Sequence, residues 1–207
     1  PLQTEDSAPQ TADGSTVVYV LDVGQGDAVL LCQDGAYCLI DTGPAEAEDA
    51  LLYDLDVLGV PSLDYLVLTH PHADHTGNAR AVLRAIHYFE ENARTLAQRD
   101  ALQAGQFDAF AALVLESGRA SFALCQNVYC STDVRHQGLS VALALSQSIL
   151  QGSTGAWRMQ GGGFAGTIQA YVPQSLLERY HSEIERVFGK GSCYILRLRE
   201  QGAVKVI

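Results

Sequence analysis

Residues 68–78 read LTHPHADHTGN, and this stretch decides how the rest of the chain is interpreted. It places His70, His72, Asp74 and His75 within six residues. Neutral imidazoles and carboxylates are the ligands that hold zinc and similar ions, and a catalytic zinc keeps one position open for water. In this spacing His70 and His72 can approach one ion while Asp74 and His75 face a second. The stretch predicts a metal site; the plainer alternative is a polar loop whose histidines contact only water and backbone.

The preceding segments predict strands, one helix and a further strand that ends at the histidines. Three β-rich runs, TVVYVLDV, DAVLLC and AYCLID, are separated by the turns GQG and QDG and predict a meander. Residues 45–58 carry apolar side chains at helical spacing and stop at Gly59 and Pro61. Residues 63–69 then predict a strand. We therefore expect the histidines in a loop at the carboxyl end of a strand, where α/β proteins commonly place their sites.

The motif THPHADHTG resembles the first metal motif of the metallo-β-lactamase fold, and Asp41 in LIDTG matches the strand-end aspartate that precedes it in that family. The run LDVGQGDAVLL, residues 21–31, resembles the hydrolase domain of ComEC-like competence proteins, a membrane-associated family that takes up DNA. The resemblance covers residues 16–78 and implies a link to DNA. It also implies a zinc or other divalent-metal site at His70, His72, Asp74, His75 and Asp41.

The same fold is built from two similar halves, so the resemblance implies further ligands later in the chain. These are a distal histidine, an aspartate in a Gly-Asp context and a last histidine. After His75 the chain has only His87, His136 and His181, each expected in a helix or helix cap. No Gly-Asp dipeptide follows the one at residues 26 and 27. The second half of the metal site is therefore expected to be absent.

The pattern changes after residue 78. Residues 79–150 hold three stretches with apolar side chains at helical spacing and no good strand candidate. Strands are then expected near residues 157–160 and 167–172, and a helix after Pro173. The last residues, 193–199 and 203–207, predict a hairpin. This second part therefore predicts an α+β unit.

A glycine-rich stretch, GGGFAG at residues 161–166, lies in this second part. Consecutive glycines let backbone approach closely and their amides can bind an anion, although a tight strand connection is the structural alternative. The runs AIHYFEENARTLAQRDALQAGQFDAFAALVLESGRASF, LCQNVYCSTDV and GAWRMQGGGFAGTIQAYVP resemble the C-terminal part of galactokinase, a sugar kinase of the GHMP class, over residues 80–207. The resemblance implies that Gly161, Gly162, Gly163 and Gly166 lie beside a site for sugar and nucleotide.

In galactokinases the phosphate-binding loop and the catalytic residues belong to an N-terminal portion, and no such loop occurs in this sequence. Phosphoryl transfer needs positioned phosphates, a metal ion and an oriented hydroxyl. ATP and Mg²⁺ are therefore expected only if a separate kinase half supplies the rest of the site. Catalytic residues cannot be assigned from the sequence.

These patterns predict an α+β chain in which the first half of a metallo-β-lactamase-like layer is joined to a GHMP-kinase C-terminal-like domain. The expected parts are a flexible leader at residues 1–15, a partial metallo-β-lactamase-like domain at 16–78 and a galactokinase C-terminal-like domain at 79–207. No linker separates the two resemblances, whereas natural fusions usually join complete domains through exposed linkers. Strands at the edge of an incomplete first half would also promote aggregation.

Three functional interpretations follow. The chain is a composite or truncated product with neither parent activity complete, a sugar-kinase module that works with a separate N-terminal half, or a metal-dependent hydrolase that uses the histidine cluster alone. Whether it is an enzyme stays open. The parent classes are an ATP-dependent sugar phosphotransferase and a metallo-β-lactamase-fold hydrolase.

Composition narrows the partners and the compartment. A net charge of −11 and a pI near 4.8 argue against a broad basic surface for a nucleic-acid backbone. The five cysteines form no CxxC pair, which indicates mostly free thiols in a reducing compartment, and the kinase-like part is expected in the cytoplasm. No apolar run reaches the roughly 20 residues that span a bilayer, and no signal-peptide pattern occurs. A start at Pro1 indicates a processed, trimmed or fragmentary product.

Overall fold

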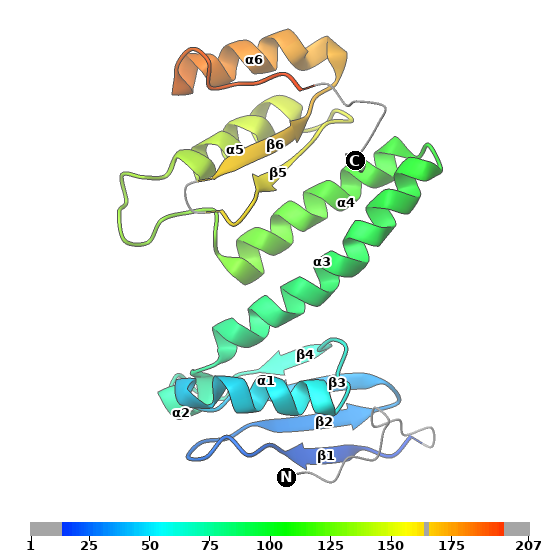
Figure 1. Ribbon diagram of the computed structural model, residues 1–207, viewed down its shortest axis with the longest axis vertical. Coiled ribbons are helices and arrows are strands. Elements are labelled where there is room, and N and C mark those ends of the chain that lie inside the picture. Colours follow the sequence, from blue (N-terminus) through cyan, green and yellow to red (C-terminus); the bar gives the residue numbers. More distant parts are fainter. Residues whose placement is uncertain (1–13, 164–165, 197–207) are drawn as a thin grey trace, which may run out of the picture. The chain divides into compact units, whose positions relative to one another are not determined.

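The computed structural model describes residues 14–163 and 166–196. They fall into two compact units, one ending at Asn127 and the other beginning at Val128 (Figure 1). Both units contain helices and strands, so the chain is of the α+β class, as the sequence predicts. The predicted domain boundary at residue 78 stays a prediction.

The first unit begins with a four-stranded sheet. Its strands, in spatial order, are β1 (Val17–Val20), β2 (Val29–Gln33), β3 (Ala36–Ile40) and β4 (Tyr65–Val67). The first three form the predicted antiparallel meander, while β4 pairs with β3 in parallel. A parallel neighbour requires a crossover connection. The chain makes it through the 3₁₀ turn η1 (Ala45–Ala47) and helix α1 (Glu48–Val57).

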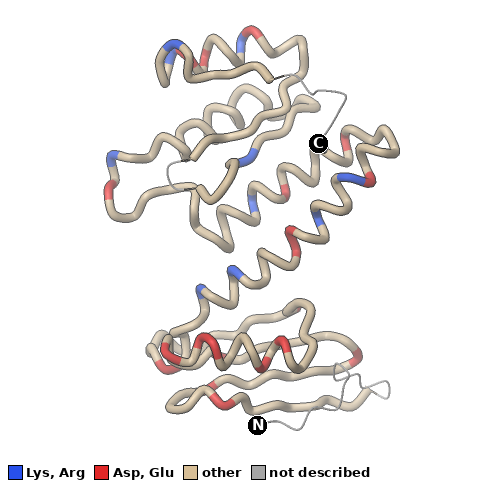
Figure 2. The backbone as a smooth tube through the Cα atoms, in the orientation of Figure 1, with Lys and Arg blue, Asp and Glu red and all other residues tan. Residues whose placement is uncertain are grey.

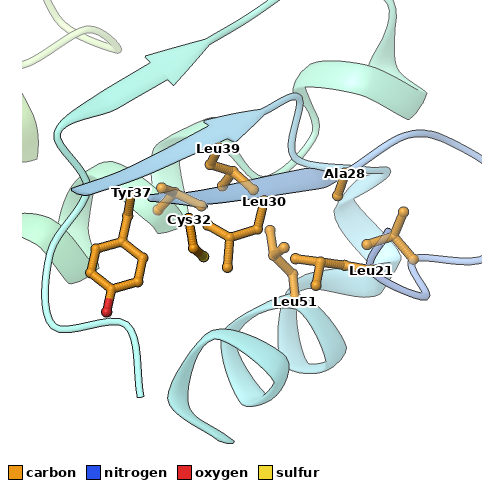
Figure 3. Packing of buried hydrophobic residues seen from close by; sticks show 9 residues of the cluster. Leu21, Ala28, Leu30, Cys32, Tyr37, Leu39 and Leu51 are labelled. Atoms are coloured by element: carbon orange, nitrogen blue, oxygen red, sulfur yellow. The ribbon is translucent and has the colours of Figure 1, made fainter. Parts of the chain in front are cut away.

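Helix α1 packs against one face of this sheet and closes the core of the first unit (Figure 3). Leu30 of β2, Leu39 of β3 and Leu51 of α1 are fully buried there. Side chains alternate between the two faces of a strand, which explains why every second residue of β2 and β3 enters this core. Burial of each such leucine contributes about 1.5–3 kcal/mol, so the core fixes the strand ends from which the histidine loop begins.

Helices complete the first unit. The short helix α2 (Ala73–Thr76) is followed by α3 (Ala79–Gln103), α4 (Phe107–Ala120) and a π-helical turn, η2 (Ser121–Cys125). Arg94 of α3 is buried between α3 and α4, where its guanidinium contacts Glu91 at 2.6 Å and Glu116 at 3.3 Å. The helical pattern predicted after residue 78 is therefore confirmed.

The second unit contains α5 (Gly138–Leu150), the antiparallel strands β5 (Ala156–Gln160) and β6 (Thr167–Tyr171), and α6 (Gln174–Phe188). Leu150, Tyr180 and Ile184 form its core, and the Ser146 and Tyr180 hydroxyls lie 2.8 Å apart. Residues 193–196 are not in a strand, so the predicted terminal hairpin is wrong there, and residues 197–207 lie outside the described residues. Of the helices in the described part of the chain, none has the length and apolar character to cross a bilayer.

Candidate metal centre

Three loops meet beside the carboxyl ends of β3 and β4. They are a first loop (residues 21–28), a second loop (residues 41–44) and a third loop (residues 68–78) that contains the histidines. Backbone hydrogen bonds join them. The Asp27 N–H donates to the Asp74 carbonyl at 3.3 Å, and the Gly43 N–H donates to the Asp27 carbonyl at 2.9 Å. The Thr42 N–H donates to the carbonyl of His75 at 2.7 Å, so the main chain itself holds the histidine loop in place.

Two glycines permit this close approach. A Cβ on Gly26 would lie 2.2 Å from the Asp74 carbonyl oxygen, and Gly26 also has a φ of +145°. A Cβ on Gly77 would lie 2.4 Å from the Ala45 nitrogen. Real Cβ atoms do not approach backbone so closely, so only glycine fits at either position. Gly26 of DVGQGD and Gly77 of HADHTG therefore allow the loops to pack against one another.

Asp41 is the buried centre of the site. It follows β3 with a φ of +58°, an uncommon conformation for a residue other than glycine, and it is 2% exposed. One carboxylate oxygen accepts the Thr69 N–H at 2.8 Å, and the other accepts the Thr69 hydroxyl at 2.6 Å. The second oxygen also lies 2.8 Å from Nδ1 of His75. The carboxylate is thus held by three hydrogen bonds from the histidine loop.

These hydrogen bonds determine which imidazole nitrogens remain available. An ionised carboxylate only accepts, so His75 must carry its proton on Nδ1 where it contacts Asp41. The single hydroxyl hydrogen of Thr69 goes to Asp41, so His70, whose Nδ1 lies 2.9 Å from that hydroxyl oxygen, donates from Nδ1 as well. Neutral His70 and His75 would then both offer Nε2 as a free metal ligand. Donation from the other ring nitrogen to a carboxylate or hydroxyl is how proteins orient such ligands.

Electrostatics reinforce the Asp41–His75 pair. Burial alone raises the pKa of a carboxyl group, but the hydrogen bonds from Thr69 and His75 outweigh it and hold the pKa of Asp41 below its ordinary value. The hydrogen bond to Asp41 raises the pKa of His75 against the opposing effect of burial, and the negative charges of Asp74 and Asp27 act in the same direction. An anionic Asp41 therefore faces the ring of His75.

The remaining predicted ligands lie next to this pair. The ring of His72 is 4.7 Å from the ring of His70, and His72 is also the N-cap residue of α2. Oδ2 of Asp74 is 3.9 Å from Nε2 of His75. Asp27 of the first loop lies 3.7 Å from Nδ1 of His75. Carboxylate oxygens and imidazoles thus lie close together in these loops, a donor set of the kind that binds divalent metals.

Asp41, His70 and His75 form a possible three-ligand group, because one ligand atom from each lies within 4.8 Å of the others. Within residues 14–163 and 166–196 no other group of histidine, cysteine and acidic side chains meets this condition. His72 and Asp74 do not belong to the group, and their role as ligands stays a prediction. The residues present fit a divalent ion, with Asp41 better suited to orient His75 than to bind the ion itself.

The later histidines have other surroundings. His136 is 3.0 Å from Asp133, and His181 is 3.7 Å from Glu185 one turn further along α6. His87 lies within α3. His136 and His181 thus each have an acidic partner within their own segment, and the expectation that none of the three histidines is a further metal ligand stays a prediction.

The glycine-rich stretch forms the turn between β5 and β6. Gly161 and Gly163 have positive φ values, and no heavy atom lies within 4 Å of a Cβ built on Gly161 or Gly162. The Gly166 N–H donates to the Gly163 carbonyl at 3.2 Å. This geometry fits the structural alternative, a tight strand connection; residues 164–165 lie outside the described residues.

Sequence reasoning missed three residues that build the site: Thr42, Thr69 and Asn78. Thr69 supplies two hydrogen bonds to Asp41, and the buried Asn78 donates from Nδ2 to the carbonyls of Thr42 and Pro44 at 2.9 and 2.6 Å. A signal was present, because Thr42 and Thr69 are polar residues directly beside the predicted ligands Asp41 and His70, and Asn78 follows His75 by three residues. Their roles depend on contacts between distant loops, which spacing alone does not reveal.

Comparison with known proteins supports the same region. Residues 21–88 match the family model of the metallo-beta-lactamase superfamily. A stretch of 71 residues is 39% identical to "Competence protein ComA" of Neisseria gonorrhoeae and covers 34% of this chain. The chain spans only 10% of the length of that curated relative. The similarity to the superfamily therefore covers β2, β3 and β4 of the sheet, the histidine loop and the start of α3.

Proposed function

We propose that the first unit is a divalent-metal-binding domain of the metallo-β-lactamase type, related to the hydrolase domains of competence proteins. The observation that carries this proposal is the Asp41–His75 contact of 2.8 Å, which occupies Nδ1 of His75 and leaves its Nε2 as the nitrogen that can bind a metal ion. The match of residues 21–88 to the superfamily and the similarity to a competence protein support it.

In this proposal His70 and His75 hold the ion through Nε2, with His72 and Asp74 completing its surroundings. Asp41 orients His75, and Thr69 orients both Asp41 and His70. A divalent ion in this place supplies Lewis-acid polarisation of a substrate oxygen. Zinc is the expected ion, because imidazole-rich sites with a carboxylate suit it.

Metal binding is the direct test. The purified chain is stripped with chelator, dialysed against zinc and analysed for bound metal, together with the His75→Ala and His72→Ala variants. His136→Ala is the matched control, because His136 is an exposed histidine paired with Asp133. We expect bound zinc in the parent chain and in the control, and its loss in His75→Ala. A parent chain that retains no zinc would contradict the proposal.

The reaction proposed for this domain is hydrolysis of a phosphate ester, because its relative is a competence protein and the parent family takes up DNA. Bis(p-nitrophenyl) phosphate is a suitable probe. We expect zinc-dependent hydrolysis to be slow, because the later ligands of the fold have no counterpart in this sequence. If zinc binds and hydrolysis is absent, the metal site stands and the hydrolase assignment fails.

The second candidate is that the chain is a composite, in which this domain precedes a galactokinase-type C-terminal module that lacks its own phosphate loop. The observation that favours it is the point at which the superfamily match ends, Tyr88, in the middle of the continuous helix α3. Sequencing reads of the source DNA across codons 70–90 test whether the two parts are encoded together. Galactose-dependent consumption of ATP tests the kinase module, and we expect none from this chain alone.

A further inference from the structure

Asp27 of the first loop has a fixed main chain and an exposed carboxylate. Its N–H donates to the Asp74 carbonyl at 3.3 Å, and its carbonyl accepts the Gly43 N–H at 2.9 Å. The residue thus joins the first loop to the two others through backbone atoms. Its side chain is 69% exposed. The carboxylate is therefore not needed to hold the loops together.

This carboxylate lies next to the candidate metal centre. Oδ2 of Asp27 is 3.7 Å from Nδ1 of His75, and Oδ2 of Asp41 is 2.8 Å from the same nitrogen. A separation of 3.7 Å is too long for a hydrogen bond, so Asp27 acts on His75 through its charge. Asp27 also does not belong to the three-ligand group of Asp41, His70 and His75. Its place is that of a charge beside the ligands rather than that of a ligand.

Three carboxylates gather at His75, and basic side chains do not offset them. In the described part of the chain, Asp27, Asp41 and Asp74 form ion pairs with His75 and with no lysine or arginine. The sequence accounts for this, because residues 14–79 contain 11 aspartates and glutamates and no lysine or arginine. Figure 2 shows acidic but no basic positions around the sheet and on α1, and the first basic positions on α3. Charges of one sign in one place attract counter-ions, which here are cations.

Asp27 and Asp41 differ in what their loss would do to the fold. Asp41 is 2% exposed and accepts two hydrogen bonds from Thr69, so its replacement disturbs the fold as well as the site. Asp27 is exposed, and an asparagine in its place would keep the shape and the backbone contacts while it removes the charge. The effect of this charge on the metal centre can therefore be measured apart from the fold.

We propose that Asp27 is a positioning residue of the metal centre. Its charge draws a divalent ion to the histidines and keeps Nδ1 of His75 facing the carboxylates, but Asp27 does not bind the ion itself. This inference rests on the metal binding proposed above. In the metal-free chain Asp27 repels the nearby Asp41 and Asp74, whereas a bound ion attracts all three. The charge of Asp27 therefore disfavours the metal-free fold and favours the metal-bound one, whereas a merely structural residue would stabilise both.

Zinc affinity is the first measurement. The full chain is stripped with chelator and titrated with zinc against a chromophoric indicator near pH 8, above the ordinary pKa of histidine. Asp27→Asn removes the charge, and Asp27→Glu keeps it. Asp22→Asn is the matched control, because Asp22 is an exposed aspartate of the same loop. Its carboxylate accepts the Gly24 N–H at 3.3 Å, a bond that the asparagine oxygen can keep.

We expect Asp27→Asn to bind zinc about three- to tenfold more weakly than the parent chain, as for loss of one exposed charge beside a doubly charged ion. The difference should shrink to less than about twofold in 1 M salt, where the Debye length is about 3 Å. Asp27→Glu and Asp22→Asn should stay within about twofold of the parent chain.

Thermal unfolding of the metal-free chain is the second measurement. Removal of the repulsion should leave the midpoint of Asp27→Asn equal to that of the parent chain or raise it by about 1–3 °C. Zinc affinity should thus fall without any loss of stability, a combination that a structural role of Asp27 would not produce.

Four results would contradict this role of Asp27. A lower midpoint together with weaker zinc binding would make the residue structural. Complete loss of zinc, as expected for His75→Ala, would make Asp27 a ligand. Equal affinity in Asp27→Asn and the parent chain, or an equal loss in Asp27→Glu or Asp22→Asn, would remove its charge from the centre while the metal site stands. If the parent chain itself retains no zinc, the proposed metal site fails and this inference fails with it.

Discussion

Nδ1 of His75 lies 2.8 Å from Oδ2 of Asp41, although the two residues are 34 positions apart in the sequence. The contact joins the end of β3 to the helix that follows β4. It therefore depends on the parallel pairing of these strands, and it makes Asp41 part of the fold as well as of the site.

Replacement of Asp41 by asparagine should destabilise the first unit. The buried carboxylate accepts three hydrogen bonds, and an amide nitrogen in its place would face a donor instead of accepting one. We expect the free energy of unfolding to fall by about 2–3 kcal/mol, as for loss of hydrogen bonds to a buried charged group. Denaturant unfolding with chelator present measures it. Asp56→Asn on the exposed face of α1 is the control, with an expected change below about 0.5 kcal/mol.

Gly26→Ala should be far more damaging than Gly24→Ala, although both glycines belong to the same loop. A Cβ at Gly26 would collide with the Asp74 carbonyl at 2.2 Å, whereas no heavy atom lies within 4 Å of one at Gly24. Both positions have positive φ, so Gly24→Ala should cost only about 1 kcal/mol. Gly26→Ala should additionally displace the histidine loop and lower zinc affinity. Equal effects in thermal unfolding and zinc titration would contradict the packing described for this loop.

Arg94→Met should destabilise the α3–α4 pair, because it leaves Glu91 without the cation that it contacts at 2.6 Å. The expected loss is about 2–3 kcal/mol, since removing one partner of a buried ion pair leaves an uncompensated charge. The double variant Arg94→Met with Glu91→Gln should recover part of the lost stability, because it removes the uncompensated charge as well. Arg99→Met, at an exposed pair with Asp100, provides the comparison and should change stability by less than about 1 kcal/mol.

Alkylation should distinguish the cysteines. The hydrogen bond with the Thr132 hydroxyl, followed by those of nearby backbone N–H groups, lowers the pKa of Cys130. Burial raises the pKa of Cys32 and of Cys193. The thiolate is the reactive form, so Cys130 should react first with iodoacetamide near neutral pH. The alkylation rate of Cys130 should also reach its plateau at a lower pH than the rates of Cys32 and Cys193. Peptide mapping by mass spectrometry measures the alkylation of each cysteine. Thr132→Val should slow the alkylation of Cys130 and leave that of the other cysteines unchanged.

Much of the fold follows from local patterns. The meander, the helix of residues 45–58 and the long helices after residue 78 were predictable because apolar spacing reports which side of an element is buried. The parallel pairing of β4 with β3 was not, since strand partners are chosen by contacts between distant segments. The strand predicted from residue 193 does not form over Cys193–Leu196, and the rest of the predicted hairpin lies outside the described residues.

Some features of the candidate site could likewise be predicted from the sequence, and others could not. The residue types and spacing of the histidine loop pointed to metal chemistry without any structural knowledge. The role of Thr69 as a donor to Asp41, and the close approach of Gly26 to Asp74, required the three loops to be seen together.

The short strand β4 connects α1 directly to the histidines, and its three residues are paired with β3 from Cys38–Tyr65 to Ile40–Val67. Side chains of a strand alternate between faces, so one residue inserted between α1 and β4 would turn Tyr65 toward the core and Leu66 toward solvent. The same slip would carry Thr69 past its acceptor on Asp41. The number of residues in segment 58–64 therefore determines the register of β4 and the position of the histidine loop. This segment should tolerate substitutions far better than insertions or deletions.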